Sequence, residues 1–211
     1  AVNDYKESVQ QAVSVAMTNS NVWSDLIRGF HTRYHSYSIR QVGCDKAQFR
    51  NKLMDQEIDF VIAGESGFSL AGLEHNVIRV EQIYLCVPTG HRFDGAQGIY
   101  LKDAKEESFV NLPESNSFRG FCDDLFKKAG IAYNAALECD YVMREKLVAA
   151  GFGVAITTNA SRRQNMNAAG IAYIPVLDAF AKRPIAIIWN PRHYLSRAAV
   201  DFRDYVMETE L

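Results

Sequence analysis

The chain contains few cysteines, and those few are not arranged for a shared site. Its four cysteines, Cys44, Cys86, Cys122 and Cys139, form no C-x-x-C pair, and no cysteine–histidine cluster has metal-ligand spacing. This pattern argues against a zinc finger and against a disulfide scaffold. We expect reduced, structural thiols, as in a cytosolic protein. A redox pair of Cys122 and Cys139 remains the alternative.

An excess of charge and a long apolar run are also absent. The 23 Lys and Arg residues against 25 Asp and Glu residues give a net charge of -2, so the chain has no general attraction for a polyanion. No apolar stretch approaches the length of a membrane span, and the N-terminus lacks the basic start and apolar stretch of a signal peptide. The chain alone is expected to bind neither nucleic acid nor a membrane, and we predict a cytoplasmic location.

Motifs of catalysis and of nucleotide binding are missing as well. The sequence has no G-x-S-x-G, H-E-x-x-H or Walker motif, and its five histidines are scattered with no nucleophile–base pair. Gly151 and Gly153 lie between a predicted helix and a predicted strand, the reverse of the dinucleotide-binding order. We interpret them as a helix stop and a tight turn. The sequence therefore predicts no enzyme, no metal site and no cofactor.

The chain does contain the pattern of an α/β fold. Hydrophobic residues make up 48% and charged residues 23% of its 211 residues, which is ordinary for a soluble domain with a core. Helical and strand periodicities alternate along the chain. The predicted helices cover residues 22–34, 46–56, 117–129, 141–150, 160–169 and 196–208, and the predicted strands cover residues 11–17, 38–44, 60–63, 74–87, 109–112, 137–140, 154–157, 171–177 and 184–189.

These elements form two α/β sets of similar size. The long extended run near Tyr84 and the strand near Ile187 are natural crossovers between the sets. We predict a discontinuous first lobe, residues 1–85 and 187–211, and a second lobe, residues 86–186. Two lobes joined by two strands leave a cleft between them, and such clefts hold ligands.

Six segments, in this order and spacing, resemble the effector-binding domain of LysR-type transcriptional regulators. They are VAMTNSNVWSDLIRGFHTRYHSYSI (15–39), LMDQEIDFVIAG (53–64), IYLCVPTGHRF (83–93), SNSFRGFCDDLFKKAG (115–130), VAAGFGVAIT (148–157) and RPIAIIWNPRHYLSRAAVDFRDYV (183–206). Two departures from the family pattern are Arg92, where the family commonly has proline, and a shorter loop after the first strand.

The resemblance implies a fold of the type 2 periplasmic-binding-protein kind, with two Rossmann-like lobes and a ligand cleft between them. It also implies a homodimer or homotetramer that senses a small-molecule effector. The family's winged helix-turn-helix and linker helix are absent from this chain, so DNA binding is implied only for a longer parent protein. The abrupt start near the first predicted strand agrees with that expectation.

Two polar triplets precede predicted helices: Thr18, Asn19 and Ser20, and Ser115, Asn116 and Ser117. Short polar side chains at these positions commonly cap a helix by accepting a bond from a free amide. The alternative is that the two helix N-termini hold an anionic group together. The resemblance favours the second interpretation, because effectors in the family often contact these loops and many are small carboxylates.

Five further residues are candidates for the ligand site. Arg119 could bind a carboxylate as a fork or be a solvated surface arginine. Glu65 and Ser66 follow a predicted strand at the expected cleft rim, where Glu65 could select an amino group. Thr157 and Thr158 end a predicted strand, where open α/β sheets place their ligands, although threonine at a strand end is also common for local reasons.

The function predicted from the sequence is effector sensing and oligomerisation in a LysR-type regulator, with a small carboxylate or other anion as the ligand. The alternative is a free-standing solute-binding protein of a transporter. A thiol redox switch is a third hypothesis. Peroxide-sensing relatives place a cysteine near the start of the second-lobe helix, but here Ser117 occupies that neighbourhood and Cys122 lies deeper in the helix.

Overall fold

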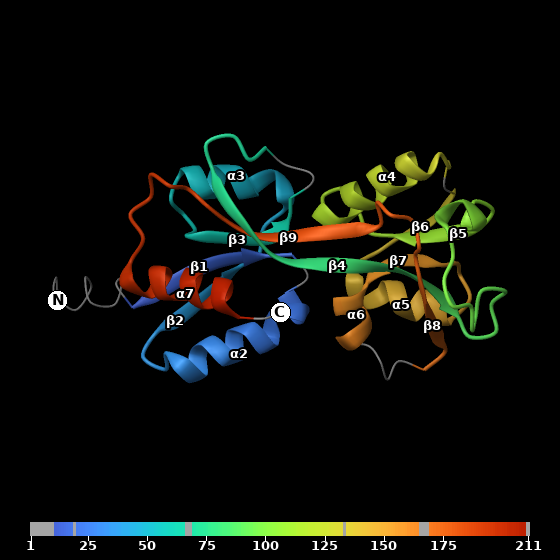
Figure 1. Ribbon diagram of the computed structural model, residues 1–211, viewed down its shortest axis with the longest axis horizontal. Helices are drawn as coiled ribbons and strands as arrows, with labels where there is room; N and C mark the ends of the chain where they lie inside the picture. Colours follow the sequence, from blue (N-terminus) through green and yellow to red (C-terminus); the bar gives the residue numbers. More distant parts are fainter. Residues whose placement is uncertain (1–10, 19, 66–68, 133, 165–168, 210–211) are drawn as a thin grey trace. The chain divides into compact units, whose positions relative to one another are not determined.

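The computed structural model describes residues 11–18, 20–65, 69–132, 134–164 and 169–209 (Figure 1). The chain divides into two compact α/β units: unit 1 is Ala1–Arg79 with Pro184–Leu211, and unit 2 is Val80–Arg183. The chain passes from unit 1 into unit 2 along β4 (Glu74–Pro88) and returns along β9 (Lys182–Trp189). Both boundaries therefore lie a few residues earlier than those expected at 85/86 and 186/187.

Unit 1 is built on a mixed sheet with the strand order β2-β1-β3-β9. The central strands β1 (Ala12–Met17) and β3 (Phe60–Gly64) pair in parallel, as do β1 and β2 (Ser38–Val42), whereas β9 runs antiparallel to β3. All five residues of β3 are buried, which is typical of a strand covered on both faces.

Helices cover both faces of the unit 1 sheet (Figure 1). On one face, α2 (Ser24–Arg33) and α7 (Arg197–Glu208) place Phe30 and Phe202 in one core with Val15 of β1. On the other face, α3 (Lys46–Met54) places Phe49 and Leu53 in one core with Ala16. Neighbouring strand residues point to opposite faces, so Val15 and Ala16 belong to different cores.

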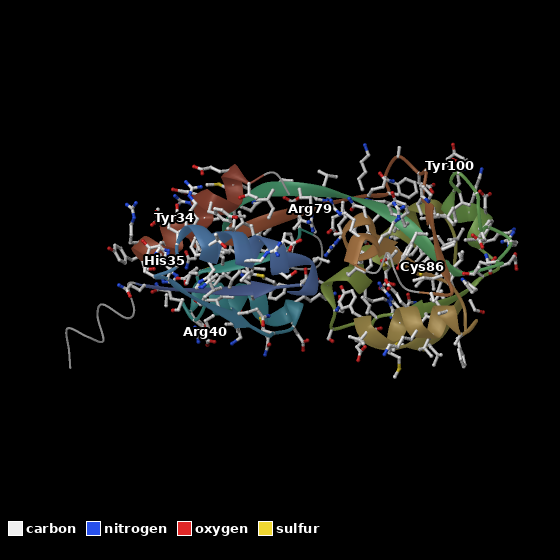
Figure 2. All side chains as sticks on the ribbon, turned by 90° about the horizontal axis from the view of Figure 1, so that it is seen from below. Tyr34, His35, Arg40, Arg79, Cys86 and Tyr100 are labelled. Atoms are coloured by element: carbon white, nitrogen blue, oxygen red, sulfur yellow. The ribbon has the colours of Figure 1, made fainter. Side chains whose placement is uncertain are left out.

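Unit 2 is built around β5 (Ser108–Asn111), with β6 (Asn134–Glu138) parallel to it on one side. A parallel bridge between Phe109 and Val154 places the chain leading into β7 (Ala155–Thr158) on the other side. Strands β7 and β8 (Ile171–Pro175) both pair antiparallel with β4. Cys86 lies on this part of β4 and is fully buried (Figure 2).

The two longer helices of unit 2 lie on opposite faces of β5 (Figure 1). Helix α4 (Ser117–Ala129) packs its buried stripe, Phe118, Cys122, Leu125 and Phe126, in one core with Phe109. Helix α5 (Tyr141–Ala149) packs Val148 in another core with Val110. Because Phe109 and Val110 are consecutive on the strand, their side chains point to opposite faces. The short helix α6 (Asn159–Gln164) follows β7.

Three local features differ from the sequence-based expectations. The helix expected from residue 22 begins as a 3-10 turn, Ser20–Trp23, and the α-helix starts only at Ser24, with no side-chain cap bond. Met54 lies in the predicted helix 46–56, and its apolar side chain would be expected in the core, but it is 38% exposed because it lies about 100° around the helix from buried Leu53. A short 3-10 helix at Leu101–Ala104 was not expected.

Candidate ligand-binding site

The carboxyl ends of three strands of unit 2 meet at one edge. Asn111 at the end of β5 is level with Glu138 at the end of β6, and β7 ends nearby because its approach runs parallel to β5. The helices that follow the adjacent strands β5 and β6 lie on opposite faces of β5. Where successive connections leave a sheet in opposite directions, a crevice opens beyond the strand ends, and open α/β folds bind ligands there.

The starts of α4 and α5 are tied together at this edge. The Asn116 side-chain oxygen accepts from the backbone N–H of Phe118 at 2.9 Å and from the Tyr141 hydroxyl at 3.1 Å. Asn116 is therefore the N-cap of α4, in agreement with the capping interpretation for this residue. Ser115 is exposed, while Ser117 is the first helical residue and is 3% exposed.

Five buried polar atoms of unit 2 have no hydrogen-bond partner in the part of the chain that the structure describes. Each can donate a hydrogen bond, and the three nitrogen atoms can only donate. Leaving such a donor buried and unpaired costs about 1–3 kcal/mol. The atoms are Asn111 Nδ2, Ser117 Oγ, Arg144 Nε, Thr157 Oγ1 and Arg183 Nε.

Two of these donors belong to buried arginines that the sequence analysis did not single out. Arg183 pairs with buried Glu81 at 2.9 Å, and its guanidinium lies 4.9 Å from the ring centroid of Phe118. The guanidinium of Arg144 lies 5.8 Å from the same ring and 5.3 Å from the ring of Tyr141. A sequence signal for Arg144 existed, because it precedes buried Val148 by four positions and therefore shares its helix face.

Arg119, the arginine that the sequence did single out, is engaged in ion pairs. Its Nε lies 2.8 Å from Asp123, and its Nη1 lies 2.5 Å from Glu138 and 3.0 Å from the Leu112 carbonyl oxygen. The guanidinium of Arg119 thus links α4 to the end of β6 and is not left open for the carboxylate of a ligand.

The thiols near this edge are not activated. Burial raises the pKa of Cys122 to about 12, although Arg144 and Arg183 act in the opposite direction. Burial also raises the pKa of Cys139, which follows β6. The thiolate is the reactive form, so these cysteines stay protonated and unreactive near neutral pH. The geometry gives the redox hypothesis no support.

The remaining candidates of unit 2 are the two threonines of β7. Thr157 is fully buried and its hydroxyl is among the unpaired donors. The Thr158 hydroxyl accepts from the backbone N–H of Ser161 at 3.3 Å, a local bond at the start of α6.

The candidates of unit 1 make local contacts where they are described. The carbonyl oxygen of Thr18 accepts from the Trp23 indole at 3.0 Å. Glu65 lies 3.3 Å from His75. Asn19, Ser66 and the side chain of Ser20 lie outside the described residues.

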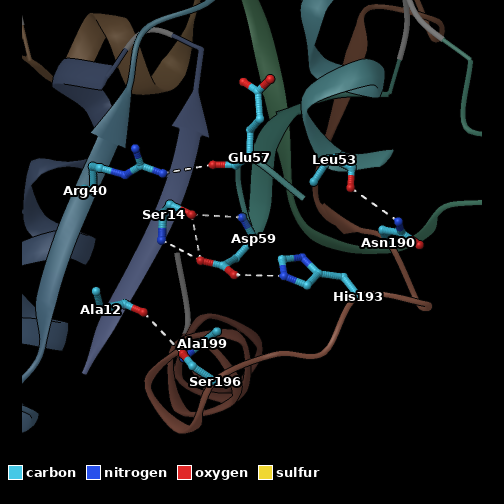
Figure 3. A network of polar contacts seen from close by, with 10 residues as sticks. All are labelled: Ala12, Ser14, Arg40, Leu53, Glu57, Asp59, Asn190, His193, Ser196 and Ala199. Carbon is cyan, nitrogen blue, oxygen red and sulfur yellow. Dashed lines mark hydrogen bonds and ion pairs between the residues drawn. The ribbon is translucent and has the colours of Figure 1, made fainter. Parts of the chain in front are cut away.

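A polar network in unit 1 brings a serine, a carboxylate and a histidine together (Figure 3). The backbone N–H and the hydroxyl of Ser14 both donate to Asp59 Oδ2 at 2.7 Å, while His193 lies 3.9 Å from Asp59 Oδ1. A serine nucleophile needs a base on its own hydroxyl, and here that hydroxyl meets the carboxylate instead of the imidazole. The network therefore links β1, the approach to β3 and the segment before α7, without forming a catalytic triad.

The described residues contain neither a candidate metal site nor a candidate membrane-spanning helix. No group of three or more histidine, cysteine, aspartate or glutamate residues is placed to hold a metal ion there. In the same part of the chain, no helix is both long and apolar enough to cross a membrane.

Comparison with known proteins gives a family match over nearly the whole chain. Residues 7–210 match the family model described as the LysR substrate binding domain. The transcriptional dual regulator GltC of Bacillus subtilis (strain 168) is 26% identical over 155 residues, which are 73% of this chain and 51% of that protein. The chain thus spans about half the length of that relative.

Two solved structures share the fold at low identity. The effector-binding domain of BenM with its effector benzoate has a TM-score of 0.81 and 18% identity, covering 94% of this chain and 91% of that one. The effector-binding domain of QuiR in complex with shikimate has a TM-score of 0.79 and 15% identity, covering 93% and 95%.

Proposed function

The chain belongs to the LysR substrate-binding-domain family, and from that premise we propose that it senses a small organic acid for a transcription regulator. The regulator's DNA-binding part would lie outside this chain. Relatives such as GltC are named as transcriptional regulators, which favours this function over a solute-binding protein of a transporter, over an enzyme and over a redox switch. A cytoplasmic location follows from the same proposal.

The observation that carries the choice of an anionic ligand is the set of unpaired donors at the carboxyl edge of unit 2. A carboxylate offers only acceptors, so it can pair with Ser117 Oγ, Asn111 Nδ2 and a guanidinium together. The thirteen-residue helix α4 begins at Ser117, and the dipole of this helix also favours negative charge at its N-terminus. Benzoate and shikimate, named with BenM and QuiR, are both carboxylates.

A thermal-shift screen of small organic acids, amino acids and neutral analogues tests the proposal. A ligand at a hundredfold excess over its dissociation constant should stabilise the native state by about 2.7 kcal/mol. We expect the hits to be carboxylates. A screen whose only hits are cationic or neutral would exclude the anion site.

We also propose that the domain self-associates, as a homodimer or homotetramer. Helix α2 is a candidate contact, because the sequence of this helix and its N-cap carries the large apolar residues Trp23, Ile27 and Phe30. In the structure Trp23 and Phe30 are buried in the unit 1 core and only Ile27 remains partly accessible. The apolar patch on α2 is therefore smaller than expected. Sedimentation at tens of micromolar tests self-association, and a single monomeric species would exclude it.

A further inference from the structure

Arg144 is a buried cation with no acidic partner in the described part of the chain. The residue is 3% exposed and its Nε has no hydrogen-bond partner there. Its guanidinium lies beside the rings of Tyr141 and Phe118. An arginine side chain stays protonated at any ordinary pH, and burying an unpaired charge is strongly unfavourable. The native fold tolerates this cost at one position beside the candidate site.

The other arginines beside the start of α4 are already neutralised. Arg183 pairs with buried Glu81. Arg119 pairs with Asp123 and Glu138. Of the three, only Arg144 brings a positive charge without a carboxylate within ion-pair distance.

The neighbouring carboxylate, Glu145, does not fill this role. Its Oε2 accepts from the Tyr173 hydroxyl at 3.3 Å. Burial raises the pKa of the Glu145 carboxyl, and Arg144 offsets that rise only in part. A carboxylate in a close ion pair with an arginine would show the opposite direction.

Arg144 is placed to reach the same ligand as Ser117. It lies one helical turn after Tyr141, whose hydroxyl donates to Asn116, the residue directly before Ser117. Its guanidinium also approaches Phe118, the residue directly after Ser117. Two independent contacts therefore bring Arg144 to the start of α4.

We propose that Arg144 determines the ligand class of this site by pairing with a single carboxylate, so that the effector is a monocarboxylic acid. This inference rests on the proposed function, sensing of a small organic acid. The single unpaired positive charge of Arg144 can balance one carboxylate of the ligand. A dicarboxylate would bring a second negative charge into a buried region whose other arginines are paired, and an unpaired buried charge is costly.

The test uses the whole chain and two methionine variants, Arg144→Met and Lys146→Met. Both remove one positive charge from α5, but Lys146 is exposed, so Lys146→Met is the matched control. The probes are benzoate with phthalate, propionate with malonate, and shikimate, read by thermal shift and calorimetry. We expect the monocarboxylate of a pair to bind the parent at least about tenfold more tightly than the dicarboxylate.

Arg144→Met should lose the response to every acid that stabilises the parent, while its own melting temperature without acid equals or exceeds that of the parent. Removing an unpaired buried charge stabilises the ligand-free protein, as expected where a functional residue lowers stability. Arg144→Lys should restore part of the binding, because it keeps the charge but loses the planar fork. Lys146→Met should match the parent in both measurements.

The outcomes separate this inference from the proposed function. If Ser117→Ala loses binding but Arg144→Met binds as the parent does, sensing of an organic acid stands and the role of Arg144 is wrong. Dicarboxylates that bind more tightly than their monocarboxylate partners would overturn the ligand class. If Arg144→Met is destabilised and still binds, its role is structural. If no acid stabilises the parent, the proposed function and this inference both fail.

Discussion

At the scale of single residues, Asn116 and Ser117 are adjacent at the start of α4 but differ in their hydrogen bonds. The Asn116 oxygen accepts two hydrogen bonds, from Phe118 and Tyr141, whereas the buried hydroxyl of Ser117 has no partner in the described structure. Asn116 thus caps the helix, whereas Ser117 is the residue that we propose for ligand binding. Sequence reasoning grouped both residues in one triplet and could not tell the two apart.

Ser117→Ala should weaken binding of an organic acid about ten- to a hundredfold, because a hydrogen bond to a charged group is worth roughly 1.5–3 kcal/mol. Without ligand, the variant should be nearly as stable as the parent, since the Ser117 hydroxyl has no hydrogen-bond partner among the described residues. Asn116→Ala is the contrasting variant and should cost about 1 kcal/mol of stability through the lost cap. Calorimetry and urea unfolding measure the two effects, and unchanged affinity in Ser117→Ala would contradict the site.

The Cys122 thiol predicts how stability depends on alkaline pH. Burial raises its pKa from an ordinary value of 9.0 to about 12. Between these values the unfolded chain has lost the thiol proton while the native protein keeps it, so stability falls as pH rises. The contribution of the protonated Cys122 thiol to the free energy of unfolding is fully present below about pH 9. Above that pH it falls by about 1.4 kcal/mol per pH unit.

Urea unfolding of the parent and of Cys122→Ala from pH 8 to 11 measures this slope. The parent should lose stability more steeply than the variant above pH 9. At pH 7 the native thiol should resist peroxide and alkylating reagents, and mild peroxide should leave the melting temperature of both proteins unchanged. Equal slopes, or rapid reaction of the native thiol, would contradict the burial argument.

At the scale of elements, the sequence predicted a helix best where the helix has both an apolar stripe and residues that mark its start and its end. Helix α4 begins and ends at the predicted residues, because Asn116 caps it and Gly130 takes a left-handed φ of 70° after its last turn. Four buried side chains of α4, Phe118, Cys122, Leu125 and Phe126, spaced four, three and one apart, then fill the unit 2 core. Local propensity and tertiary packing agree in this helix.

The sequence predicted less well where tertiary contacts override local preference. The 3-10 turn before α2 forms where the Trp23 indole bonds back to the Thr18 carbonyl, a contact that periodicity does not reveal. Arg144 was missed for a related reason. Arginine is usually exposed, and only the packing of α5 against the rings of Phe118 and Tyr141 shows that this one is not.

The turn between α5 and β7 depends on two glycines with different requirements. Gly151 has a φ of 81° with open space around it, whereas Gly153 has a φ of 150° and a Cβ there would collide with the Ser108 carbonyl oxygen. Gly151→Ala should therefore cost about 1 kcal/mol of stability, for the backbone conformation alone. Gly153→Ala should cost roughly 3 kcal/mol or more, because strain and collision add.

Urea unfolding of the two alanine variants measures this difference. Gly151→Asn should recover part of the loss, since asparagine tolerates the left-handed region. Equal destabilisation by the two alanines would show that the Ser108 carbonyl moves aside freely.

At the scale of the whole molecule, unit 2 is an uninterrupted stretch of chain whereas unit 1 needs both ends of the sequence. The two ends of unit 2 lie beside each other, because Glu81 and Arg183 form an ion pair at 2.9 Å. Replacing residues 80–183 by a short flexible linker should therefore leave unit 1 folded. Its core, including Val13, Phe60 and Phe202, lies entirely within unit 1.

Circular dichroism and urea unfolding of this shortened chain test the prediction. A single cooperative transition is expected, since insertion of one domain into another at adjacent ends is widely tolerated. A chain without a cooperative transition would show that unit 1 depends on unit 2. The matched control is a full-length chain carrying the same linker inserted at the exposed loop residue Gly95.

The discontinuity of unit 1 also bears on the order of events at the ribosome. Residues 80–183 emerge complete while residues 184–211 are still to be made, a delay of roughly one to six seconds at ~5–20 residues per second. Until residues 184–189 have been added, β3, with all five residues buried in the native state, lacks the neighbour that β9 provides. An uncovered apolar strand edge invites pairing with other chains. Nascent chains halted just after Arg183 should therefore be prone to aggregation and should be recognised by chaperones, even though they contain all of unit 2.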